Sequence, residues 1–280
     1  MIAHAPLSLQ GWVRAIDEAD IPILERSALA VAALQADEDN VSARDIADLA
    51  QDDPLLSLRI LAHAARRRSS RMSSQAETVT ACLLMMGTSA FFKACAQAPT
   101  VESRLAQVPG ALDGLRRVLE RSHRAARLAI GFAMHRQDTD AEVIHEAALL
   151  HDFAEVLLWC HAPHLALTMR SRQRADPSLR SAQVQREILH IELSDLEQAL
   201  MRAWQLPELL RELTDPRLSA QPRVRNVLLA TALARHSQNG WHNAALPDDF
   251  EAIGQLLNLS TGAVRSLVRD IDLTTEDPAY

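Results

Sequence analysis

The chain has 280 residues, of which 48% are hydrophobic but only 4% are aromatic, and its net charge is −7 at pH 7. Because alanine, leucine and arginine favour helices whereas aromatic and β-branched residues favour strands, we expect an all-α fold. The acidic balance argues against broad nucleic-acid binding, and no run of about 18 uncharged apolar residues predicts a membrane span.

The cysteines Cys82, Cys95 and Cys160 form no C-x-x-C pair and stand among apolar residues. We interpret them as small core residues of a protein in a reducing compartment. The chain begins "MIAHAPLSLQGW", which lacks the basic region and the apolar region of a signal peptide. These features predict a cytoplasmic protein.

Apolar periodicity and capping residues predict a series of short helices in the first third of the chain. One helix is expected to open at the proline near residue 22 and to continue through Leu34. Ser42 precedes Asp45 by three positions, which is a capping pattern for the next helix, and Asp53-Pro54 starts another. Residues 78–98 are apolar, and we assign their methionine and phenylalanine side chains to the core.

Residues 66–77 form the most polar internal segment, with four arginines and four serines. One interpretation is a solvated loop. The other is a loop that binds a phosphate group or a protein partner, because guanidinium groups pair well with phosphate and carboxylate oxygens. In that second interpretation the binding residues are Arg66, Arg67, Arg68 and Arg71.

Further helices are expected in the rest of the chain. A long one is predicted over 115–137, and the next should start at Asp138 and Asp140 and stay helical to Trp159. His161 and His164 flank Pro163, which predicts a turn rather than a helical ligand pair. One short helix is expected within 162–177, one or two helices within 179–207, another short helix within 207–216, and a single helix in each of 222–240 and 247–271.

Four segments, in this order, resemble the HDOD family: "DIADLAQDDPLLSLRILAHAA", "LLMMGTSAF", "ALLHDFAEVLL" and "AWQLPELLREL". The resemblance covers about residues 20–215. It implies an HD-like helical bundle, similar in fold to HD-type metal phosphohydrolases but usually without enzymatic activity, used in bacterial signalling and regulation. We therefore expect a helical lead-in over 1–19, an HDOD-like domain over 20–215, and a C-terminal helical extension over 216–280 packed on it.

A catalytic HD site needs several ligands from different helices, because one or two metals must be held with positions open for water and phosphate. Three residues are candidates: His123 and the adjacent pair His151 and Asp152. The resemblance implies that other positions of the site lack the metal ligands, and the lysine after the His-Asp pair, that active members carry. Those positions hold Ala154-Glu155, Leu193, Glu197, Thr214-Asp215 and Thr231, and His190 lies about one turn from the place where it would substitute.

We therefore expect a non-enzymatic module that binds a protein partner, with no metal and no cofactor. His123, His151 and Asp152 would form a vestigial metal or ligand pocket, and the sensing of a small molecule there is a hypothesis. One alternative is a metal-dependent phosphohydrolase or phosphodiesterase that acts on a nucleotide. Another is a DNA-binding regulator, because residues 42–61 and 252–271 resemble helix-turn-helix halves and the second offers Arg265 and Arg269.

Overall fold

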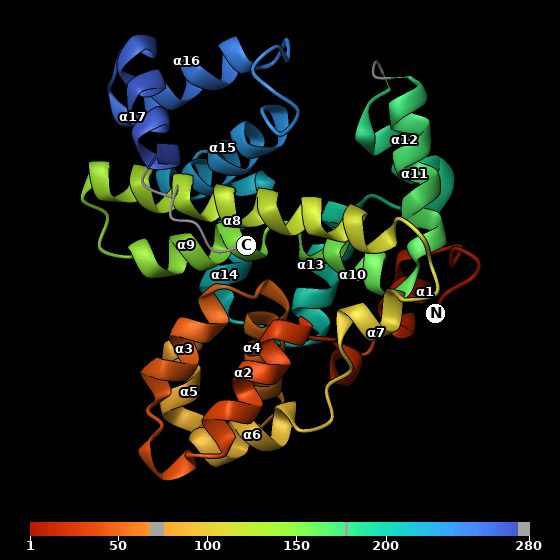
Figure 1. The fold of residues 1–280 in the computed structure, drawn as a ribbon. Helices are drawn as coiled ribbons and strands as arrows, with labels where there is room; N and C mark the ends of the chain where they lie inside the picture. Colours follow the sequence, from red (N-terminus) through yellow and green to blue (C-terminus); the bar gives the residue numbers. More distant parts are fainter. Residues whose placement is uncertain (68–75, 177–178, 274–280) are drawn as a thin grey trace. The chain divides into compact units, whose positions relative to one another are not determined.

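The computed structural model describes residues 1–67, 76–176 and 179–273 (Figure 1). Within these ranges the chain is helical and contains no β-strand, which confirms the predicted all-α class; the one β-type contact is an isolated bridge between Ile23 and Thr100. None of the helices in the described ranges combines the length and the apolar character that crossing a bilayer requires. Arg68 and Arg71 lie outside the described residues.

By the contacts between Cα atoms, the chain divides into two compact units, each built from two stretches of sequence. Unit 1 comprises Met1–Leu119 and Asp152–Glu208, and unit 2 comprises Glu120–His151 and Leu209–Tyr280. The division of the chain into segments 1–19, 20–215 and 216–280 stays a prediction.

Unit 1 holds the N-terminal helices and those that follow the His-Asp pair. Its elements are α1 (Leu9–Ala15), η1 (Glu18–Asp20), α2 (Glu25–Gln35), η2 (Glu38–Asn40), α3 (Ala43–Gln51), α4 (Pro54–Arg67), α5 (Val79–Met86), α6 (Thr88–Cys95), α7 (Val101–Leu105), the beginning of α8 (Ala111–Arg136), α10 (Phe153–His161), α11 (Pro163–Ala175), α12 (Ser181–Leu189) and α13 (Leu193–Ala203).

Unit 2 holds the remainder of α8 and the C-terminal helices. Its other elements are α9 (Ala141–Leu150), α14 (Glu208–Leu213, whose first residue belongs to unit 1), η3 (Pro216–Leu218), α15 (Pro222–His236), α16 (Leu246–Leu257) and α17 (Thr261–Leu273). The expected single helix over 247–271 is wrong. It divides because Asn258 adopts a left-handed backbone conformation, with φ of 55°, that ends α16.

Local sequence signals set several helix starts in unit 1. At α3, the backbone N–H of Asp45 donates to Ser42 Oγ over 3.3 Å and the N–H of Ser42 donates to Asp45 Oδ2 over 2.8 Å, so the predicted capping pattern is present. Helix α2 begins at Glu25 rather than at the proline, because Ile23 is extended and pairs with Thr100. Gly87, with φ of 80°, separates α5 from α6.

Asp53 starts α4 from a fully buried position. Its Oδ1 accepts from the backbone N–H groups of Leu55 and Leu56 over 2.9 and 3.2 Å, and its Oδ2 accepts from the N–H of Leu24 over 3.1 Å. Burial raises the pKa of this carboxyl even though these hydrogen bonds act to lower it. The side chain therefore joins the start of α4 to the segment that precedes α2.

Tryptophans organise the core of unit 1. Trp12 in α1 is buried and its indole N–H donates to the Leu189 carbonyl over 2.9 Å. Phe153 and Trp204 pack with their ring centroids 6.0 Å apart. Within the described residues all three cysteines are buried and unbridged, as predicted. The burial of these large side chains supplies the main driving force for folding the unit.

Candidate functional site

The His-Asp pair lies in a turn between two helices, where one continuous helix was expected. Helix α9 ends at Leu150 and α10 begins at Phe153. The Asp152 carbonyl accepts from the N–H groups of Glu155 and Val156, over 2.9 and 3.1 Å, and these bonds start the new helix. The expectation of unbroken helix through Trp159 is therefore wrong. The Asp152 side chain is buried, whereas His151 is half-buried.

The three candidate ligands are divided between the two units. His123 is half-buried on α8 and, like His151, belongs to unit 2, whereas Asp152 belongs to unit 1. In the described part of the chain, no three or more His, Cys, Asp or Glu side chains are grouped so that they would hold a metal ion. The vestigial metal or ligand pocket stays a prediction.

The two candidate arginines that the structure describes lie in the last turn of α4, where cations are favourable because they face the carbonyl end of the helix dipole. Arg66 is exposed and its guanidinium lies 3.4 Å from a carboxylate oxygen of Glu18. An exposed ion pair of this kind is weak, on the order of 0 to 1 kcal/mol, so Arg66 can exchange it for a partner's carboxylate. Arg67 lines a cavity.

This cavity has a volume of about 230 Å³ and lies between α4, α5 and the turn that follows α13. Its lining is mostly apolar and includes Leu61, Cys82, Met85, Met86 and Pro207, with Arg67 as its one cation among the described residues. We name it the Met85 cavity.

Helix α5, which lines the Met85 cavity, exposes two apolar side chains. Leu84 is 72% exposed and Met85 is 47% exposed. Phe91 and Phe92 are buried, as predicted for residues 78–98, but assigning Met85 to the core is wrong. The reason is that α5 is apolar all round, so composition alone does not reveal which face meets the core.

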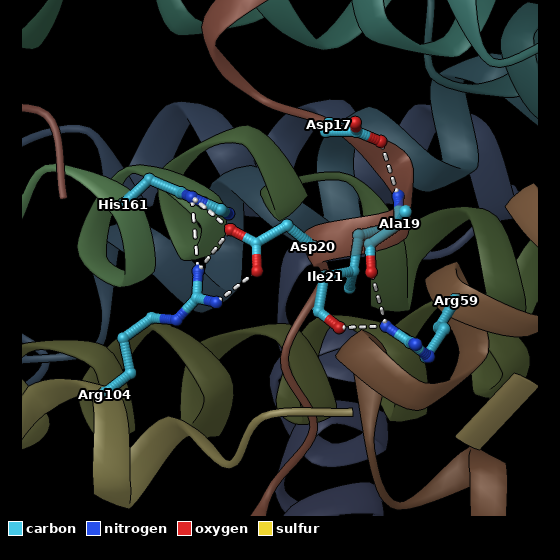
Figure 2. A network of polar contacts seen from close by, with 7 residues as sticks. All are labelled: Asp17, Ala19, Asp20, Ile21, Arg59, Arg104 and His161. Atoms are coloured by element: carbon cyan, nitrogen blue, oxygen red, sulfur yellow. Dashed lines mark hydrogen bonds and ion pairs between the residues drawn. The ribbon is translucent and has the colours of Figure 1, made fainter. Parts of the chain in front are cut away.

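A cluster of polar contacts connects the N-terminal segment of unit 1 to three helices, α4, α7 and α10 (Figure 2). The Arg104 guanidinium in α7 forms a two-pronged ion pair with the Asp20 carboxylate, and one prong is 3.0 Å long. The same guanidinium lies 3.3 Å from Nδ1 of His161, at the end of α10. Arg59 in α4 donates to the carbonyls of Ala19 and Ile21, over 3.2 and 2.5 Å.

The charges in this cluster follow from burial. His161 is buried beside a guanidinium, and burial together with the Arg104 charge lowers its pKa to about 4, although Asp20 acts in the opposite direction. Partial burial acts to raise the pKa of Asp20, but the hydrogen bonds and charge of Arg104 hold it below its usual value. Because neutral His161 accepts from Arg104 at Nδ1, its proton is on Nε2, which finds no hydrogen-bond partner among the described residues.

The cluster is therefore a fixed set of charges that holds η1 in place. Sequence reasoning missed it, because Asp20, Arg104 and His161 are far apart in the chain and each is unremarkable in its local pattern. The only local sign is Pro163, which ends α10 near His161 and so brings the imidazole to a helix end.

The residues proposed for DNA contact lie on α17. The Arg265 guanidinium stacks over the Phe250 ring, with 4.3 Å between its central carbon and the ring centroid. This cation–π contact engages the side chain within unit 2. Arg269 is exposed, and Asp270 next to it offsets its charge.

The helical architecture places this chain in the class of all-α, HD-like bundles. It belongs to the HDOD domain family, whose model matches residues 21–217. No curated protein sequence matches the chain.

Several crystal structures have a similar fold. The MmoQ response regulator from Methylococcus capsulatus str. Bath is 19% identical, with a TM-score of 0.65, over 91% of this chain and 99% of its own. A virulence factor from Campylobacter jejuni subsp. jejuni is 15% identical, with a TM-score of 0.62, over 94% of this chain and 93% of its own. An HDOD domain protein of unknown function from Geobacter sulfurreducens is 16% identical, with a TM-score of 0.51, over 96% of each chain. At such identities the likeness establishes the fold alone.

Proposed function

We propose that this protein is a non-enzymatic module of bacterial signalling that acts by binding another protein through the Met85 cavity. Membership of the HDOD family and the description of MmoQ as a response regulator support the signalling role. The observation that carries the binding role is the cavity itself, an apolar hollow lined in part by the exposed Met85, in a helix that also exposes Leu84. Exposed apolar surface gathered around a hollow is typical of a binding site.

The chemistry of the Met85 cavity specifies how a partner would bind. A volume of about 230 Å³ accommodates one or two apolar side chains, and methionines adapt their shape to such an insert. Arg67 in the lining and Arg66 near it would pair with carboxylates that flank the inserted side chain. The expected partner segment is therefore apolar at its centre and acidic beside it.

Catalytic inactivity is the second part of the proposal. Two positions where active relatives are expected to carry site residues are occupied here by the buried side chains of Leu193 and Thr231. A leucine offers no lone pair to a metal, and the Thr231 hydroxyl already donates to the Val227 carbonyl over 2.9 Å. We expect protein purified without chelator to contain no stoichiometric iron, manganese or zinc, and to leave a generic phosphodiester intact. Metal at one equivalent together with turnover would establish the phosphohydrolase alternative instead.

The binding role is tested by comparing two exposed methionines. Met85→Glu places a carboxylate at the mouth of the cavity, and Met134→Glu makes the same change in unit 2, at a side chain that is 69% exposed. In pull-downs from the native cell with tagged protein, we expect the wild type and Met134→Glu to retain the same partner and Met85→Glu to lose it. A partner captured equally by all three proteins would exclude the cavity as the binding site. Matching thermal unfolding of the two variants controls for folding.

A further inference from the structure

Unit 1 carries a second hollow, lined by residues of α2, η2 and α3. Helices α2 and α3 lie next to each other (Figure 1). Its volume is about 510 Å³ and it is open to solvent along one side. The floor is apolar and consists of Ala30, Ala33, Leu34, Val41 and Leu49. We name it the α2–α3 groove.

Helix α2 leaves much of its apolar surface uncovered. After Arg26 it contains no charged residue through Gln35, and only Ser27 and Val31 are buried. Leu29 is 68% exposed. A helix that is apolar on its outer face as well as its inner face is typical of an element that another protein covers.

The edges of the groove are acidic. Asp37 and Asp45 line it, and residues 37–52 contain six acidic residues against one arginine, Arg44. Two local contacts hold the lining carboxylates in place: Asn40 donates to Asp37 Oδ1 over 2.7 Å, and Ser42 donates to Asp45 from its backbone and its hydroxyl. The hydrogen bonds from Ser42 lower the pKa of Asp45, so this carboxylate stays charged. Each carboxylate keeps lone pairs for a further donor.

From the groove and its charge, we infer that the α2–α3 groove binds an amphipathic helix of a partner protein whose apolar face is flanked by lysine or arginine. Apolar residues at i, i+3 or i+4, and i+7 would lie on the alanine and leucine floor. Cations on both sides of that face would reach Asp37 and Asp45. Helix α2 has 11 residues and is about 16 Å long, which matches about three turns of a bound helix.

The charge also argues against other occupants. A second copy bound through the same face would bring its own Asp37 and Asp45 against those of the first, because a two-fold interface pairs a surface with itself. Nucleic acids and anionic membranes would be repelled by the acidic edges. The groove shares no lining residue with the Met85 cavity, for which an acidic partner is proposed, so this inference does not depend on the proposed function.

The test is a selection from a phage-displayed library of helical peptides of about four turns on the immobilised full chain. Two variants of α2 decide the result. Ala33→Arg places a bulky cation in the groove and offsets part of its negative charge, and Ala32→Arg makes the same change at the neighbouring exposed alanine, which does not line the groove. Arginine is a good helix former at exposed positions, so both variants should fold, and thermal unfolding checks this.

We expect the enriched peptides to include cationic ones with apolar residues at helical spacing, alongside any acidic peptides that bind the Met85 cavity. A fluorescent copy of the strongest cationic peptide should bind the wild type and Ala32→Arg alike and Ala33→Arg at least about tenfold more weakly. Its affinity should fall as NaCl is raised from about 50 mM to about 500 mM, which shortens the range of the charge interaction. No enrichment of cationic peptides, or equal binding of the strongest cationic peptide to both variants, would overturn the inference. A dimer in analytical ultracentrifugation that only Ala33→Arg dissociates would overturn it in favour of self-association.

Discussion

Gly114 in helix α8 is predicted to be intolerant of even one methyl group. A Cβ atom built at this position would lie 2.2 Å from Cη2 of Trp159, 2.4 Å from its Cζ3 and 2.6 Å from its Cζ2. All three distances are far below ordinary van der Waals contact, and Trp159 is only 4% exposed, so its ring has no free space into which to move. The glycine therefore permits α8 to pack against α10 within unit 1.

The expected magnitude follows from two opposing effects. Alanine is more favourable than glycine in a helix by about 1 kcal/mol. Overpacking of a close-packed core costs about 1–3 kcal/mol, and occasionally more. Because the clash involves three atoms of a rigid ring, we take the upper end of this range, which predicts that Gly114→Ala lowers the free energy of unfolding by about 2 kcal/mol. Urea unfolding followed by circular dichroism measures the change.

Two further variants test whether the contact between Gly114 and Trp159 causes the loss of stability. Gly262 lies in α17, where the nearest atom to a new Cβ is Ser260 Oγ at 3.9 Å, so Gly262→Ala should stabilise the protein by about 0.5–1 kcal/mol. Trp159→Phe removes the six-membered ring of the indole, which carries the clashing atoms. It should therefore lower the free energy of unfolding less in the Gly114→Ala background than in the wild type. If Gly114→Ala proved neutral or stabilising, the close approach of α8 to Trp159 would be refuted.

Three further predictions concern stability. The free energy of unfolding should decrease as the pH falls from about 6.5 to about 4, because the pKa of His161 is about 4 in the folded protein against about 6.5 unfolded, so the unfolded state binds more protons in this window. Urea unfolding at several pH values should show that the free energy of unfolding depends less on pH in His161→Asn than in the wild type. The same pH dependence in both proteins would contradict the assignment. Asp53→Ala should lower the free energy of unfolding by about 2–3 kcal/mol in the same assay, because three backbone N–H groups lose their acceptor. Asp53→Asn keeps an acceptor oxygen and should lower it less, and equal losses in the two variants would count against an acceptor role. Ser42→Ala should cost about 1 kcal/mol through loss of the α3 cap, and a change near zero would mean that tertiary packing alone fixes this helix start.

The sequence by itself determined the helical class, the family and the features that depend on near neighbours. The Ser42–Asp45 cap involves residues three positions apart, and Asp53-Pro54 marks the start of α4 because aspartate caps a helix and proline fits its first turn. The burial of the cysteines followed from their apolar surroundings. These features are readable because the atoms that interact are separated by only a few bonds along the chain.

The tertiary structure alone decided which surfaces are covered and which distant residues meet. It turned Met85 outward, it brought Asp20 and Arg104 to His161, and it placed Trp159 against the one α8 glycine that gives it room. None of these outcomes has a local pattern, because an apolar helix has the same sequence whether a neighbour covers one of its faces or leaves it exposed. Packing between helices selects the covered face, and that selection leaves the Met85 cavity and the α2–α3 groove open at the surface of unit 1.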